Sequence, residues 1–112
     1  PMVTIGCGFS QGAVLVSAAG LSGAIHFDGI AILAGFALLP QAPVGATHLP
    51  QRAFVAHGSS DDTIPVDKAR ESVAKLRSLG ISIDYIEEGV GHKVGIQGTR
   101  GLREWLFYWE AS

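Results

Sequence analysis

Ser10, Asp61 and His92 are of the residue types that catalyse acyl transfer, and they occur in that order along the chain. Ser10 is the centre of the pentapeptide GFSQG at residues 8–12, which has the pattern G-x-S-x-G. A serine in a tight turn between a strand and a helix needs small residues two positions away, because the backbones crowd there. The amide of Gln11 would then point to where an oxyanion forms, assisted by the start of the helix. The pentapeptide alone also fits a serine that only caps a helix.

A serine nucleophile needs a base, and the base needs a group that orients its ring. His92 ends the segment GVGH at residues 89–92, whose glycines allow a tight turn that directs the imidazole back over a sheet. Asp61 and Asp62 lie in the polar segment HGSSDDTIP at residues 57–65, and the residues alone leave both open as the acid. Together the segments predict a triad of serine, histidine and aspartate.

Strands and helices that would position these residues alternate along the chain. Apolar and β-branched runs predict strands over residues 2–7, 29–34, 53–56 and 81–85. Helical spacing predicts helices over residues 13–19 and 66–79 and from Leu102 to Trp109. This order predicts an α/β fold with a parallel sheet of about four strands and crossover helices, as one domain over residues 1–112. Reactive groups collect at the carboxyl ends of such strands, where the three residues lie.

Composition excludes several other classes of function. The chain has 112 residues, 47% of them hydrophobic and 16% charged, with a net charge of −2 and no basic cluster. Neither nucleic acid nor an anionic membrane is therefore expected as a partner. No apolar run approaches the roughly 18–20 residues of a membrane helix, and no signal peptide is visible, so we predict a cytoplasmic protein.

The remaining titratable residues suggest structural roles. His26 and His48 have no partners at a metal-binding spacing, so no metal or other cofactor is predicted. Cys7 lies in an apolar run, which favours a buried and unreactive thiol. His57 is expected to form a structural hydrogen bond. Glu87 is expected, with its neighbour Glu88, to be solvated at a strand end.

The segments GFSQGA, HGSSDDTIP and GVGH resemble the nucleophile, acid and base motifs of serine α/β-hydrolases of the carboxylesterase, phospholipase and acyl-protein thioesterase type. The whole chain resembles the C-terminal half of that family. The resemblance implies that Ser10 is the nucleophile, His92 the base and Asp61 the acid, with Asp62 its neighbour. It also implies hydrolysis of a small ester or thioester through an acyl-enzyme.

The substrate pocket is less clearly indicated by the sequence. Leu38, Leu39 and Val44 lie at or near a long proline-rich segment, where they could line an acyl pocket or simply pack.

The resemblance also implies that strands before the elbow are absent, together with the loop that donates the second oxyanion N–H. The first strand would then be an exposed apolar edge. We therefore expect a second polypeptide that supplies the N-terminal half, or a homo-oligomer. The alternative is a non-catalytic half-domain used for binding or assembly.

Overall fold

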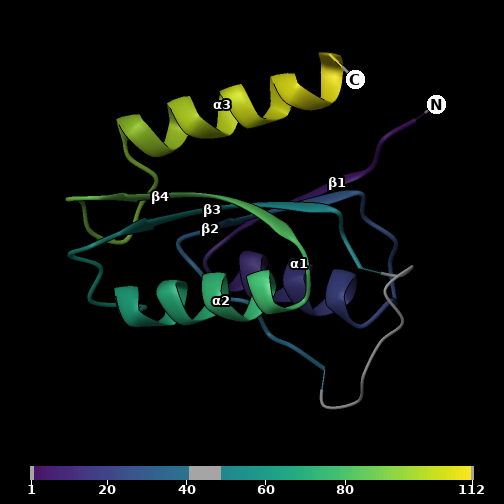
Figure 1. Ribbon diagram of the computed structural model, residues 1–112. Coiled ribbons are helices and arrows are strands. Elements are labelled where there is room, and N and C mark those ends of the chain that lie inside the picture. Colours follow the sequence, from purple (N-terminus) through teal and green to yellow (C-terminus); the bar gives the residue numbers. More distant parts are fainter. Residues whose placement is uncertain (1, 41–48, 112) are drawn as a thin grey trace.

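The computed structural model describes residues 2–40 and 49–111, and in these residues strands and helices alternate as expected (Figure 1). The elements are β1 (Ile5–Phe9), α1 (Gln11–Leu21), β2 (Gly29–Leu33), β3 (Arg52–Gly58), α2 (Val66–Ser78), β4 (Ser82–Glu88) and α3 (Ile96–Ala111). The four strands form one sheet in the order β1-β2-β3-β4, and every neighbouring pair is parallel. The predicted α/β fold with a four-stranded parallel sheet is therefore confirmed.

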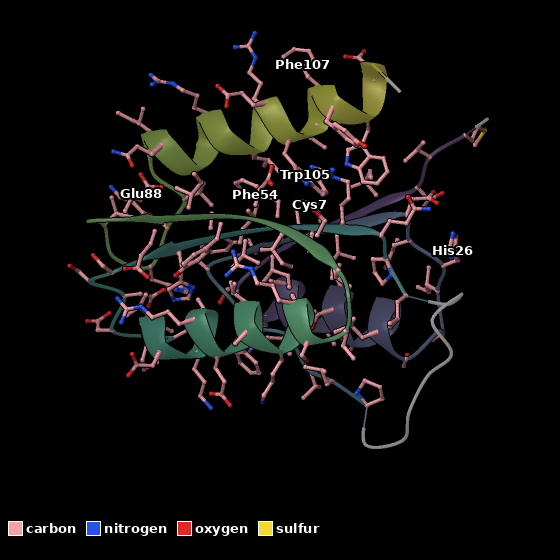
Figure 2. All side chains as sticks on the ribbon, viewed as in Figure 1. Cys7, His26, Phe54, Glu88, Trp105 and Phe107 are labelled. Atoms are coloured by element: carbon pink, nitrogen blue, oxygen red, sulfur yellow. The ribbon has the colours of Figure 1, made fainter. Side chains whose placement is uncertain are left out.

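The sheet is the middle layer of three, with α1 and α2 on one face and α3 on the other (Figure 1). Strands β2 and β3 are buried because helices cover both faces, which explains their continuous apolar sequences. On the α3 face, Trp105 is 2% exposed and its ring packs 6.0 Å from that of Phe54 (Figure 2). Phe107, on the opposite side of α3, is 52% exposed.

Strand β1 starts three residues later than the sequence predicts. It pairs only with β2 among the described residues, and Ile5 is opposite Gly29, the first residue of β2. Residues before Ile5 therefore have no strand beside them, and Met2 is 94% exposed. Strand β1 also ends later than predicted, at Phe9, and α1 begins at Gln11. The chain therefore passes from strand to helix within the single residue Ser10.

The expectation that Cys7 is buried is wrong, because the thiol lies on the exposed edge strand. Helix α3 packs mainly over β3 and β4 rather than over this edge strand. A sheet edge strand with an uncovered face leaves its side chains in solvent.

Glu87 joins β4 to α2. Its carboxylate accepts hydrogen bonds of 2.9 and 2.8 Å from the Arg70 guanidinium and one of 2.7 Å from the Tyr85 hydroxyl. The Arg70 hydrogen bond, followed by that of Tyr85, lowers the pKa of Glu87 to about 2. A carboxyl with a depressed pKa stabilises the fold above its ordinary pKa and loses that contribution as the pH falls through the lowered value.

We expect Glu87→Gln to reduce the free energy of unfolding at pH 7 and to have a much smaller effect at pH 2. The contribution of the Glu87 charge is complete above pH 4.5, the ordinary pKa, and is lost as the pH falls toward 2. Urea denaturation of both proteins at several pH values measures the difference. A difference that is constant from pH 7 to pH 2 would contradict this account.

Candidate active site

Ser10 occupies the single residue between β1 and α1, and its backbone is strained. Its φ is 57° and its ψ is −119°, a left-handed conformation that residues other than glycine rarely adopt. The Ser10 amide donates a 2.8 Å hydrogen bond to the Leu33 carbonyl at the end of β2, which fixes the turn. A methyl group added at Gly8 would overlap the Gly12 carbonyl, so the turn requires a small residue there. The turn therefore places the hydroxyl at the carboxyl edge of the sheet.

Ser10, His92 and Asp61 form one continuous line of contacts. Ser10 Oγ lies 2.9 Å from His92 Nε2, and His92 Nδ1 lies 2.8 Å from Asp61 Oδ2. An ionised carboxylate only accepts hydrogen bonds, so Nδ1 carries the imidazole proton. Nε2 of a neutral ring is then unprotonated and accepts the hydrogen bond of the Ser10 hydroxyl. This is the protonation state in which an imidazole can take a proton from serine.

The Asp61 side chain is fully buried, whereas Asp62 is exposed. Burial tends to raise the pKa of Asp61, but hydrogen bonds from His92 and from the amides of Ile64 and Thr63 outweigh it and hold the pKa below its usual value. Asp61 is thus ionised at neutral pH. The structure brings Asp61 and not Asp62 to His92.

A second histidine, His57, lies beside Asp61. His57 is 1% exposed, and its Nε2 donates a 2.7 Å hydrogen bond to the Ile64 carbonyl. The same nitrogen lies 3.4 Å from Asp61 Oδ2, the oxygen that His92 also contacts. The expected structural hydrogen bond of His57 is therefore present, and it closes the turn that holds Asp61.

The acid loop, residues 59–65, packs directly on the base loop, residues 89–95. The Ser60 amide donates a 3.0 Å hydrogen bond to the Val90 carbonyl. A methyl group added at Gly58 would overlap that same carbonyl, so only glycine allows this approach. The Phe9 ring covers the base from the other side, with its centroid 5.2 Å from that of His92.

Gln11 begins α1, and the first amides of a helix have no carbonyl partner within it. Its N–H therefore lies beside Ser10 at the positive end of the helix dipole, where a developing oxyanion would be stabilised.

A cavity of about 740 Å³ opens beside Ser10. Its other lining residues are mainly apolar and are Phe9, Gln11, Val14, Leu15, Phe36, Thr63 and Ile64. The apolar residues of this wall were not predicted from the sequence. Val14 and Leu15 could have been found from the GFSQG turn itself, because side chains one turn into the helix lie next to Ser10.

Leu38 and Leu39 line a different cavity, of about 260 Å³, between the segment after β2 and helix α2. The Leu38 amide donates a 2.9 Å hydrogen bond to Ser17 Oγ, and the Ala37 amide donates a 2.8 Å bond to Ser72 Oγ. These bonds fasten the segment to α2 and α1. Val44 lies outside the described residues, and a substrate-binding role for the three residues stays a prediction.

Neither a metal centre nor a membrane-spanning helix is apparent in the described part of the chain. No three His, Cys, Asp or Glu side chains in residues 2–40 and 49–111 are grouped as metal ligands. In the same ranges, every helix is too short or too polar to cross a bilayer.

The parallel sheet, the strained serine turn and the contacts from Ser10 through His92 to Asp61 define an α/β-hydrolase fold. The sequence of residues 2–109 matches the phospholipase/carboxylesterase family, and the chain belongs to that family. The resemblance inferred from the three motifs is therefore confirmed.

Solved structures agree with this assignment. The chain is similar to esterase PE8, with 27% identity and a TM-score of 0.80 over 94% of this chain and 49% of that one. It shares the fold of acyl-protein thioesterase 2 from Zea mays, with 20% identity and a TM-score of 0.72 over 91% of this chain and 54% of the other. It also shares the fold of a phospholipase/carboxylesterase from Dyadobacter fermentans DSM 18053, with 21% identity and a TM-score of 0.69 over 89% and 50%.

The chain thus spans about half the length of the structures that it matches. No curated protein is significantly similar in sequence.

Proposed function

We propose that the protein hydrolyses carboxylic esters or thioesters through an acyl-enzyme formed on Ser10. The observation that carries this proposal is the unbroken line from Ser10 Oγ through the His92 ring to the ionised Asp61 carboxylate. Family membership supports the same chemistry.

The reaction begins when Ser10 Oγ attacks the substrate carbonyl carbon and His92 Nε2 takes the hydroxyl proton. Asp61 stabilises the imidazolium that forms, and the Gln11 amide faces the oxyanion. His92 then gives its proton to the departing alcohol or thiol as the bond to the carbonyl carbon breaks. Water attacks the acyl-enzyme, again losing a proton to His92, and the acid leaves as Ser10 recovers its proton.

The direct test is turnover of p-nitrophenyl acetate by the native protein together with labelling by a fluorophosphonate probe. We expect hydrolysis, and we expect the probe to add once, at Ser10, as located by mass spectrometry of peptides. A protein that neither turns over the ester nor reacts with the probe would refute the proposal.

The apolar cavity beside Ser10 suggests where the acyl chain or alcohol of the substrate lies. A Leu15→Ala variant tests this placement. Leu15 is 70% exposed, so Leu15→Ala removes cavity wall without opening the core. Each buried CH₂ contributes about 0.8 kcal/mol, so we expect the preference for p-nitrophenyl hexanoate over acetate to fall roughly tenfold. The ratio of kcat/KM for the two esters measures this preference.

Leu38→Ala is the matched control, because this exposed leucine lines the separate cavity. We expect it to leave the ratio unchanged. A loss of preference in Leu38→Ala alone would instead place the acyl pocket along the segment after β2.

We further propose that β1 pairs with a strand from a second polypeptide segment equivalent to the other half of the matched structures. Strand β1 is at the edge of the sheet, and its neighbours Met2 and Val3 are exposed. Such an edge pairs readily with another strand. Size-exclusion chromatography with intact-mass measurement should detect a second segment, and a self-paired dimer or a well-behaved lone chain would contradict this arrangement.

A non-catalytic binding module is the second candidate, because the chain spans about half of the structures it matches and the family resemblance assigns the second oxyanion donor to a loop of the other half. Losing one donor typically costs about 10²–10³ in rate. This candidate predicts no turnover of p-nitrophenyl acetate at any pH.

A further inference from the structure

Glu88, the last residue of β4, is buried at the point where the base loop begins. It is 9% exposed, so the expectation of a solvated carboxylate at this strand end is wrong for Glu88. Figure 2 shows its side chain between the end of β4 and the start of α3, on the side of the sheet that α3 covers. A buried carboxylate is costly unless its oxygens accept hydrogen bonds, so its partners reveal its role.

The partners of Glu88 are three backbone amides at the start of α3. The Gln97 amide donates a 3.1 Å hydrogen bond to Oε1, and the Gly95 and Gly98 amides donate bonds of 3.1 and 2.8 Å to Oε2. The first amides of a helix lack partners within it, and a local Ser, Thr, Asp or Asn ordinarily caps them. Helix α3 has Gly95 in that place, so the distant Glu88 side chain serves as the cap.

The main chain of Glu88 also contacts the acid loop. Its carbonyl accepts 2.8 Å hydrogen bonds from the amides of Ser59 and Val90. Glu88 lies opposite Gly58 in the register of the sheet, and Gly58 leads into the loop that carries Asp61. One residue therefore joins the acid loop, the first turn of the base loop and the start of α3.

The base loop, residues 89–95, carries His92 near its middle, and both of its ends are fixed by Glu88. Its first end follows Glu88 in the chain, and its last residue, Gly95, binds the Glu88 carboxylate. A methyl group at Gly95 would overlap Oε1, so the loop end fits closely around the carboxylate. A small displacement of His92 would lengthen the 2.9 Å contact with Ser10.

We infer that Glu88 is a positioning residue: its carboxylate fixes the last residue of the base loop, its main chain fixes the first turn, and together they hold His92 between Ser10 and Asp61. The inference rests on the proposed hydrolase function for its kinetic consequence, but not for its structural one. Glu88 itself does not contact the reacting atoms.

Glu88→Ala, Glu88→Gln and Glu87→Gln, made in the full-length native protein, test this role. Because misplacement of a catalytic group by about 1 Å costs on the order of 10²-fold, we expect kcat for p-nitrophenyl acetate to fall by about 10²-fold in Glu88→Ala with KM little changed. Glu88→Gln keeps one accepting oxygen and should recover part of kcat. Glu87→Gln removes the adjacent carboxylate, which binds Arg70 and Tyr85 away from the loop, and should retain the kcat of the unmodified protein.

A second measurement does not depend on catalysis. The proton on His92 Nδ1, hydrogen-bonded to Asp61, gives a low-field NMR signal, which we expect to broaden or disappear in Glu88→Ala and to persist in Glu87→Gln. Should Glu88→Ala fail to fold, Glu88→Gln decides by the same two readouts. A folded variant with an unchanged kcat and an unchanged His92 signal would overturn the inference. An inactive native protein that resists the probe would instead refute the hydrolase function, and the His92 signal would still test the role of Glu88.

Discussion

Replacing Ser10 with alanine is expected to abolish ester hydrolysis, with kcat falling by about 10⁴–10⁶-fold. The loss is large because Oγ is the atom that bonds to the acyl group in the proposed mechanism, and no other hydroxyl takes its place 2.9 Å from His92 Nε2 in the described structure. The fold should be retained, because the strained turn is held by backbone contacts, such as the bond from the Ser10 amide to Leu33. Initial rates with p-nitrophenyl acetate and a thermal denaturation curve measure both expectations.

Ser60→Ala provides the control for Ser10→Ala. Ser60 is an exposed serine of the adjoining acid loop, and its backbone amide, not its side chain, contacts the base loop. Turnover and fluorophosphonate labelling should both survive this change. Labelling that persists in Ser10→Ala would show that another residue is the nucleophile.

Replacing Asp61 with asparagine is expected to lower kcat by about 10⁴-fold at neutral pH. An amide group facing His92 donates to Nδ1, so the ring proton moves to Nε2 and the imidazole can no longer accept the Ser10 proton. Asparagine keeps the size of the side chain and an oxygen for the amides of Thr63 and Ile64. The structure should therefore change little while catalysis is lost. Pre-steady-state acylation rates measure the loss of catalysis.

Asp62→Asn is the matched control, because Asp62 is exposed while its neighbour Asp61 is buried against His92. We expect the activity of Asp62→Asn to remain within about twofold of the unmodified protein, since surface substitutions away from such contacts have small effects. Equal losses in both variants would argue against a specific role for Asp61. The lowered pKa of Asp61 further predicts that Asp61 stays ionised in mildly acidic solution and so continues to accept the hydrogen bond from His92 Nδ1.

Most of the fold could be predicted from the sequence because its central strands are apolar on both faces. The run GIAIL became β2 with every residue buried, as expected of a parallel strand between two helical layers. The position of β1 was less predictable, since its start depends on where Gly29 begins the neighbouring strand. Such pairing is a long-range property that local composition does not encode.

The candidate site also contains residues that the sequence could predict and one that it could not. Ser10, His92 and the adjacent pair Asp61 and Asp62 could be selected because each follows a strand of one parallel sheet, and those strand ends meet at one edge. The choice of Asp61 over Asp62 came from the family resemblance. Glu88 could not be selected by alternation along β4, which does not indicate what a strand-end carboxylate contacts. One signal was available: Gly95 precedes α3 without any capping side chain, so a helix of 16 residues needed an acceptor from elsewhere.

The contact between Ser10 and His92 joins residues 82 positions apart in the sequence. Long-range contacts of this kind form late, because a large loop must close before they are made. During synthesis Ser10 is therefore made long before His92. We expect the Ser10 hydroxyl to stay unactivated until β4 and the loop after it have packed against the rest of the sheet. Covalent labelling of Ser10 during a refolding time course would thus report when β4 and the loop after it reach their folded positions.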